Sequence, residues 1–115
     1  MDAKPKELVI VSITMCNKYE AEGPYTSTDK LEDRSGVYTI LTRANTNEKW
    51  TVIDVGESSG LKSRVEGHDR ADCWKRHSKG VIGYAPYYTP NAQQAGRKQV
   101  EQEIRAKYNP ACGDR

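Results

Sequence analysis

The chain contains no phenylalanine, and its aromatic bulk comes instead from seven tyrosines and two tryptophans. Aromatic rings with a polar tip suit the half-buried positions of a small core between helices and strands. With 115 residues, the chain has enough sequence for one modest core. We therefore expect a single domain over residues 1–115, of α/β (α+β) class.

Cysteine is scarce, with three widely spaced residues and no CxxC pair. An odd number at such spacings argues against a disulfide scaffold, so we expect free thiols and a cytoplasmic, reducing compartment. Cys73 and His77 stand four residues apart on a predicted helix and, with Cys112, would offer three metal ligands. Structural zinc requires four well-matched ligands, so a buried cysteine beside a solvated histidine is the preferred interpretation.

Long hydrophobic runs are also missing. The run Leu8–Met15 is too short to cross a bilayer, and it follows Glu7 without a small-residue cleavage site. We therefore expect no membrane association. Apolar residues alternate along this run, which predicts a half-buried strand. With the aperiodic stretch that follows, it forms a predicted N-terminal extension over residues 1–35, a strand plus a loop.

Three common catalytic signatures are absent: the GK[ST] phosphate loop, HExxH and GxSxG. Their absence argues against P-loop nucleotide hydrolases, HExxH metalloproteases and α/β-hydrolases. The formal net charge is only +2, but residues 1–59 carry a net charge of −3 and residues 60–115 one of +5. A basic second half is compatible with a polyanionic partner, and equally with solvated helical faces.

The remaining sequence alternates between strand-like and helix-like stretches. In chain order, the predicted elements are strands over 36–42 and 49–55, helices over 61–68 and 70–77, a strand over 81–89 and a helix over 91–108. Residues 43–48 are expected to form a hairpin loop, and Gly56 is expected to end the second strand. Pro86 lacks a donor N–H, so the third strand is expected to lie at a sheet edge or to carry a bulge there.

Taken one at a time, the candidate functional residues have ordinary structural interpretations. Tyr38 is typical of strand packing, Arg64 of a helix surface, and His68 of a cation at a helix end. Glu101 and Glu103 flank the apolar stripe of the last helix almost symmetrically. Periodicity therefore leaves open which of the two glutamates faces a site.

In combination, these motifs resemble the GIY-YIG nuclease family. The matching features are GVY at 36–38, DVG at 54–56, LxxR ending at Arg64, a histidine four residues later, and VEQEIRAKYNP at 100–110. The resemblance covers residues 36–110 and implies a three-stranded antiparallel sheet flanked by helices, in the order β-β-α-α-β-α. The residues alone predict the same order, with Leu8–Met15 as an extra N-terminal strand. The family's glutamate precedes a YNP-like ending, and this spacing selects Glu101.

The resemblance implies hydrolysis of a DNA phosphodiester with one divalent metal ion, Mg²⁺ or else Mn²⁺. Glu101 would bind the metal, while Tyr38 would act on the attacking water as a general base or an orienting group. Arg64 would hold the non-bridging oxygens, and His68 would assist proton transfer or bind phosphate. Further candidate phosphate contacts are His77, Lys62 and Arg97. DNA is thus the expected partner, with specificity coming from a protein partner, oligomerisation or DNA structure.

Two positions depart from the family pattern. Asp54 stands where the family has the tyrosine of its second motif, and Glu57 stands where many members have a lysine just after the glycine of that motif. A negative charge at about 6 Å would repel a phosphate by about 3 kcal/mol at an effective dielectric near 20. Asp54 could therefore disable cleavage, serve as a metal ligand or base, or be a polar strand-end residue. The alternative functions are a catalytically weakened module that binds nucleic acid or a protein, and an interaction protein without a nucleic-acid role.

The nuclease hypothesis makes a spatial demand on the fold. It requires Tyr38, Arg64, His68 and Glu101 to line one cleft, although they come from three separate elements.

Overall fold

The computed structural model describes residues 12–113 and has a mixed α+β fold built on a three-stranded antiparallel sheet and three helices. The elements, in chain order, are β1 (Ser12–Met15), β2 (Tyr19–Glu22), the 3₁₀-helix η2 (Thr28–Lys30), β3 (Gly36–Arg43), β4 (Thr51–Ser58), α1 (Leu61–Glu66), α2 (Ala71–Arg76), β5 (Val81–Tyr88) and α3 (Gln94–Tyr108). Within these residues, no helix combines the length and the apolar character needed to cross a membrane.

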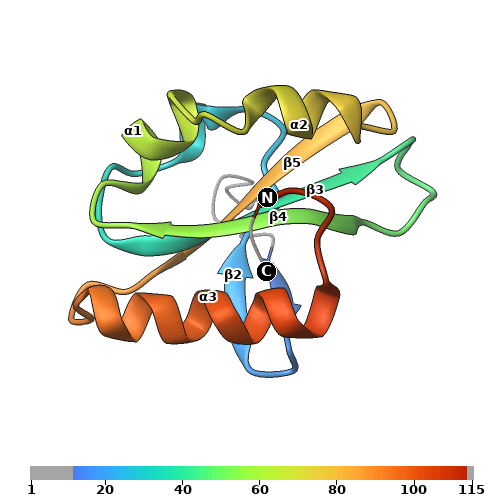
Figure 1. Ribbon diagram of the computed structural model, residues 1–115. Coiled ribbons are helices and arrows are strands. Elements are labelled where there is room, and N and C mark those ends of the chain that lie inside the picture. The colour runs from blue at the N-terminus through green and yellow to red at the C-terminus, as the bar shows by residue number, and fades with distance from the viewer. Residues whose placement is uncertain (1–11, 114–115) are drawn as a thin grey trace, which may run out of the picture.

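The three-stranded sheet has the order β4-β3-β5, so β3 is the central strand. Helices α1 and α2 cover one face of this sheet, and α3 crosses the other face (Figure 1). The predicted order β-β-α-α-β-α is therefore confirmed from β3 to α3. Of the two alternatives predicted for the strand that contains Pro86, an edge position or a bulge, the structure shows the edge position, since β5 is an outer strand.

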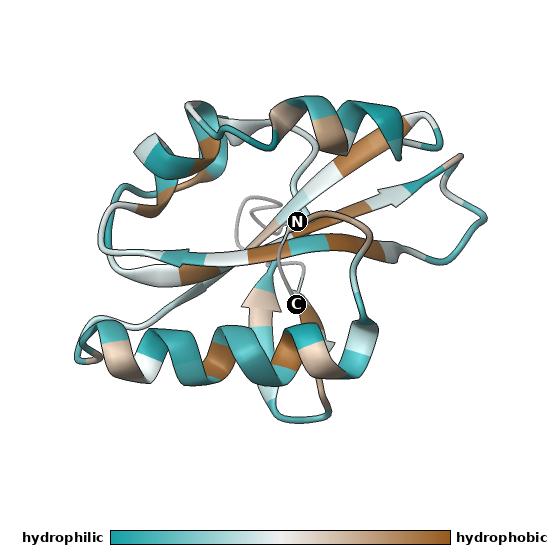
Figure 2. Ribbon diagram, in the orientation of Figure 1, coloured by the Kyte–Doolittle hydropathy of each residue, from teal (hydrophilic) through white to brown (hydrophobic). Residues whose placement is uncertain are grey.

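Each face of the sheet carries its own hydrophobic core. Alternate residues of β3 separate the two cores, because Val37 and Leu41 belong to the core beside α3 and Tyr38 and Ile40 to the core beside α1 and α2. Trp74 anchors α2 in the second core with 3% of its surface exposed. Figure 2 shows hydrophobic residues along the central strands and mostly hydrophilic residues over α3. The helices are thus held by burial of one face each.

The N-terminal extension holds more structure than the sequence predicts. Of the predicted strand Leu8–Met15, the structure shows Ser12–Met15, and the part before Ser12 lies outside the described residues. The stretch that follows, predicted as a loop, contains β2, which pairs antiparallel with β1 in a separate two-stranded sheet. This hairpin places Met15 and Tyr19 in the core beside α3, so it is an integral part of the domain.

Strand β4 does not end at Gly56, as predicted, but continues to Ser58. It remains paired with β3 over this stretch, where Gly56 lies opposite Tyr38 and Ser58 opposite Gly36. Helix α1 then begins at Leu61, and Asp33 accepts hydrogen bonds from the backbone N–H and the hydroxyl of Ser63 at 2.9 and 2.8 Å. A side chain distant in sequence therefore supplies the cap for this helix.

The expectation of free thiols is wrong for two of the three cysteines. Cys73 on α2 and Cys112 after α3 form a disulfide, whereas Cys16 is free. Spacing did not reveal the pair, because its members are 39 residues apart and meet only through the tertiary fold. Closing a loop of that length contributes about 4 kcal/mol in the chain-entropy treatment. The cytoplasmic location stays a prediction and loses the support of reduced thiols.

Candidate functional site

A small polar cavity lies at the β4 edge of the sheet, where β3, β4, α1 and α3 meet. Its volume is about 170 Å³, enough for a phosphate group or several water molecules. It is lined by Tyr38, Gly56, Glu57, Arg64, Arg70, Lys98 and Glu101. A hollow of about 360 Å³ on α3 is larger, but its lining of Gln102, Arg105, Ala106 and Asn109 contains a single charged side chain. The smaller cavity is taken as the candidate site because Tyr38, Arg64 and Glu101 meet in it.

Gly56 allows Tyr38 to reach this cavity from the central strand. The two residues are paired across β3 and β4, and the tyrosine ring lies over the position where a side chain on residue 56 would be. A Cβ atom at Gly56 would stand 2.1 Å from the Tyr38 hydroxyl oxygen and 2.3 Å from Cζ. The glycine is required here by close approach rather than by backbone conformation.

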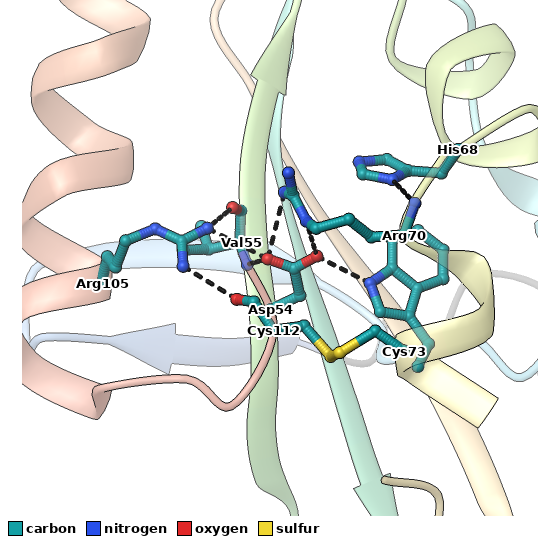
Figure 3. Close-up of a disulfide and its surroundings, with 8 residues drawn as sticks. Asp54, Val55, His68, Arg70, Cys73, Arg105 and Cys112 are labelled. Carbon is teal, nitrogen blue, oxygen red and sulfur yellow. Dashed lines mark hydrogen bonds and ion pairs between the residues drawn. A yellow bond between two sulfur atoms is a disulfide. The ribbon is translucent and has the colours of Figure 1, made fainter. Parts of the chain in front are cut away.

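His68 contacts the hydroxyl group of Tyr38 but is not among the residues that line the cavity. Its Nε2 atom lies 2.6 Å from the Tyr38 hydroxyl oxygen, and its Nδ1 accepts the backbone N–H of Arg70 at 2.9 Å (Figure 3 shows the second bond). Because Nδ1 is an acceptor, the proton of a neutral ring resides on Nε2 and is donated to Tyr38. His68 therefore orients Tyr38, and in this geometry its ring is not among the side chains that line the cavity.

The two rings differ in how burial affects their protonation. Burial, reinforced by Arg64 and Arg70, lowers the pKa of His68 to about 4, so the ring is neutral at neutral pH. The contact between its Nδ1 and Asp69 at 3.3 Å is then not an ion pair. Burial raises the pKa of Tyr38 to about 12, so the phenol keeps its proton. Since His68 donates to the phenol oxygen, the Tyr38 O–H is left to donate into the cavity.

We expect His68 to make folding stability pH-dependent in the acid range. Its pKa is about 6.5 in an unfolded chain and about 4 in the fold, so the unfolded state binds the extra proton between these values. Stability should thus be complete above pH 6.5 and fall by about 2–3 kcal/mol as the pH drops to 4. Urea unfolding at several pH values would measure this slope. His68→Gln should flatten it, and His77→Gln, which changes the other histidine, should leave it intact.

Three cations line the cavity, and two of them are weakly engaged. Arg64 bonds to the exposed Asp69 at 3.1 Å, an ion pair of the kind that contributes little, and Lys98 lies 3.8 Å from Glu57. Arg70 is instead fixed by Asp54 through Nε at 2.8 Å. The sequence analysis missed Arg70 and Lys98, because neither stands in a motif. Their placement depends on contacts with partners 16 and 41 residues away.

Asp54 lies outside the cavity and is removed from the candidate catalytic residues. Its side chain is 0% exposed and accepts five hydrogen bonds of 2.7–3.2 Å from donors on four residues (Figure 3). These donors are the backbone N–H of Val55 and the side chains of Arg70, Trp74 and Arg105. A carboxylate so fully engaged has no capacity for a metal or a proton-transfer role. The expected repulsion of phosphate by Asp54 is cancelled by its two arginines.

Glu57 does line the cavity, but its charge is largely offset. Arg97 donates to it through Nε at 2.8 Å, and both side chains are about nine-tenths buried. The same guanidinium also donates to the Ser35 hydroxyl. Arg97, a predicted phosphate contact, is therefore a structural residue that holds Glu57 against α3.

The two glutamates of α3 face different surroundings. Glu103 accepts hydrogen bonds from Lys18 and Tyr19 at 3.0 and 2.8 Å, on the side of the β1–β2 hairpin. Glu101 points into the cavity, with 19% of its side chain exposed. It accepts no hydrogen bond from any residue in the range 12–113, and its nearest cation, Arg105, is 3.8 Å away. Burial raises the pKa of Glu101, as expected for a carboxylate that lacks donors.

The other predicted phosphate contacts, Lys62 and His77, do not line the cavity. Lys62 is half-buried on α1, and His77 is exposed at the end of α2, next to the Cys73–Cys112 disulfide.

Comparison with protein-family models, curated proteins and solved structures found no match to this chain. The functional interpretation therefore depends on the geometry of the cavity.

Proposed function

We propose that this chain is a GIY-YIG-like, metal-dependent endonuclease that hydrolyses phosphodiester bonds of DNA. The observation that carries the proposal is the convergence of Tyr38, Arg64 and Glu101 on one polar cavity from β3, α1 and α3. Phosphoryl chemistry needs cations for the phosphate, a carboxylate for a metal and a group that orients water. This cavity offers all three kinds of group.

The cations of the cavity suit a phosphodiester. Arg64 and Arg70 present guanidinium groups, which bind phosphate oxygens through two parallel N–H donors. Lys98 adds a third positive charge from α3. The negative charges among the lining residues are those of the carboxylates Glu57 and Glu101. Because Arg70 is held by the buried Asp54, it can meet the charge that develops on the phosphate without having to be ordered first.

Glu101 fits a single divalent cation of the Mg²⁺ or Mn²⁺ type. It is a partly buried carboxylate without a hydrogen-bond donor among the described residues, whereas Glu57 is occupied by Arg97. Mg²⁺ is commonly held by one or two carboxylates together with water and substrate phosphate. When bound, such an ion neutralises phosphate charge and stabilises the leaving oxygen.

Tyr38 is better suited to orient the attacking water than to deprotonate it. Its pKa of about 12 keeps the phenol protonated, and His68 fixes the ring through a bond of 2.6 Å to the hydroxyl oxygen. The O–H can then donate to a water molecule or a phosphate oxygen in the cavity. Of the two roles predicted for Tyr38, the geometry supports the orienting one.

The test is a nicking assay with supercoiled, branched and single-stranded DNA in Mg²⁺ or Mn²⁺. Glu101→Ala and Arg64→Ala should each lower the nicking rate by about 100-fold or more, because each removes a group that acts on the transition state. Glu103→Ala is the matched control on α3 and should retain activity, because Glu103 faces Tyr19. Nicking that survives both cavity changes would refute the proposal.

The second candidate function is a binding module of the same fold without cleavage activity. Tyr38 is the one tyrosine among the described residues that line the cavity, and this favours the binding module. Asp54, which stands where the resemblance would place a second tyrosine, lies outside the cavity and is bound by Arg70 and Arg105. Gel-shift measurements on the same DNA substrates separate the two functions. Binding that depends on Arg64 and Arg70, without nicking in either metal, would identify the binding module.

A further inference from the structure

A second group of metal-ligand side chains lies outside the cavity, at the junction of α2 with the tail that follows α3. Cys73, His77 and Cys112 bring their sulfur and ring nitrogen atoms within 4.8 Å of one another. None of the three residues lines the candidate nuclease site. The cluster is independent of the proposed function, and His77 takes no part in the disulfide.

We propose that, when the disulfide is reduced, Cys73, His77 and Cys112 bind a zinc ion. Two thiolates and an imidazole are the ligands that Zn²⁺ prefers, at about 2.3 Å for sulfur and 2.0–2.1 Å for nitrogen. Ligand atoms of a tetrahedral site built with these bonds are about 3.3–3.8 Å apart. After reduction the two sulfur atoms, which are bonded in the disulfide, would separate, and the ring nitrogen, which lies within 4.8 Å of them, would approach. Rotations of the three side chains would supply both movements. Hard cations such as Mg²⁺ are disfavoured by this ligand set.

The backbone around Cys112 holds its sulfur near α2 independently of the disulfide. The Cys112 N–H donates to the carbonyl oxygen of Ile53 at 2.9 Å, and its own carbonyl accepts from Arg105 at 2.9 Å. Cys112 is also 1% exposed, within the core beside α1 and α2. Because these contacts do not involve the sulfur atoms, they remain after reduction. The metal site is therefore largely organised before the ion arrives.

His77 is free to serve as the third ligand. It caps the C-terminal end of α2, four residues after Cys73, so both side chains project from the same face of the helix. Its ring is exposed and, within the range 12–113, has no hydrogen bond or ion pair. One side of the ion would face solvent, which leaves the fourth position to water.

The two states interconvert by balanced chemistry. A dithiol reductant supplies two electrons and two protons, the bond between the sulfur atoms breaks to give two thiols, and the reductant becomes a disulfide. Binding of Zn²⁺ then releases the two thiol protons, so metal affinity rises with pH. Either the disulfide or the metal joins α2 to the tail, and the junction therefore persists in both redox states.

The test uses Co²⁺ as a spectroscopic probe of the full chain, after reduction with a phosphine, which does not compete as a thiol ligand. The reduced protein should bind one Co²⁺ per chain with a thiolate-to-cobalt charge-transfer band, and Zn²⁺ should displace it. Untreated, disulfide-bonded protein should show no such band. Zn²⁺ should also raise the melting temperature of the reduced protein and leave that of the oxidised protein unchanged.

Two variants separate this site from adventitious thiol binding. His77→Ala should weaken Co²⁺ binding by more than the roughly 10–100-fold that outer-shell changes cause, without altering the disulfide-bonded protein. Cys16→Ser, the matched cysteine control, should leave the band unchanged. Absence of the band in the reduced protein, or unchanged affinity in His77→Ala, would overturn the proposal. Neither result bears on the nicking assay, which measures a different site.

Discussion

Replacing Asp54 by alanine is expected to lower the free energy of unfolding by about 3–5 kcal/mol, because the change leaves two arginines without their buried counter-charge. Arg70 and Arg105 reach Asp54 from opposite sides of β4, and Trp74 donates its indole N–H to the same carboxylate at 2.7 Å. Urea unfolding with the disulfide intact measures the loss. Asp54→Tyr should be at least as harmful because this position is fully buried.

The control for this prediction is Asp69→Ala, which removes an aspartate that also pairs with an arginine. Its ion pair with Arg64 is exposed and screened by solvent, so the loss should be much smaller than that of Asp54→Ala. A loss below about 1 kcal/mol for Asp54→Ala would show that Arg70 and Arg105 find other partners or reach solvent. In that case Asp54 would not be the centre of the network in Figure 3.

The second large effect is expected for Gly56→Ala, which should lower nicking by about 100-fold or more while retaining the fold. The added Cβ would lie 2.1 Å from the Tyr38 hydroxyl oxygen, so the ring must leave the cavity and its bond with His68. We expect a smaller cost in stability, about 1–3 kcal/mol, as is usual for overpacking. Gly67→Ala is the matched control, since its nearest neighbour would be a Ser63 oxygen at 3.6 Å.

A double-mutant cycle tests the stated cause directly. In a Tyr38→Ala background the ring is missing, so adding Gly56→Ala should cost little stability. The coupling energy between the two positions should therefore be large, about 1–3 kcal/mol. Additive effects would mean that the alanine at position 56 acts through something other than Tyr38.

The order of elements was predictable because it depends on local patterns. The hairpin of β3 and β4 was predictable from β-branched and aromatic residues on both sides of a polar turn. Pro86 indicated an edge position for β5, with a bulge as the alternative. The short strand β2 was missed although YEAE alternates apolar and charged side chains, because the alternation lasts for only four residues. Local signals of that length are too weak to separate a strand from a loop.

The direction of single side chains was not predictable in the same way. Asp54 and Gly56 stand two residues apart on β4, so they share one face of the sheet. Whether that face is also the face of Tyr38 depends on the pairing register, which shifts between Ile40 and Leu41. A shift of one residue would turn every side chain to the other face. Contacts such as that of Asp54 with Arg105, 51 residues away, appear only once the chain is folded.

The network around Asp54 also closes the outer edge of the sheet. Strand β4 is an edge strand, and its outward N–H and C=O groups would otherwise offer a template to a strand of a second molecule. Asp54 accepts the Val55 N–H, Arg105 donates to the Val55 carbonyl, and Cys112 donates to the Ile53 carbonyl. The contacts that fix Arg70 at the cavity are thus joined to those that protect this chain against edge-to-edge aggregation.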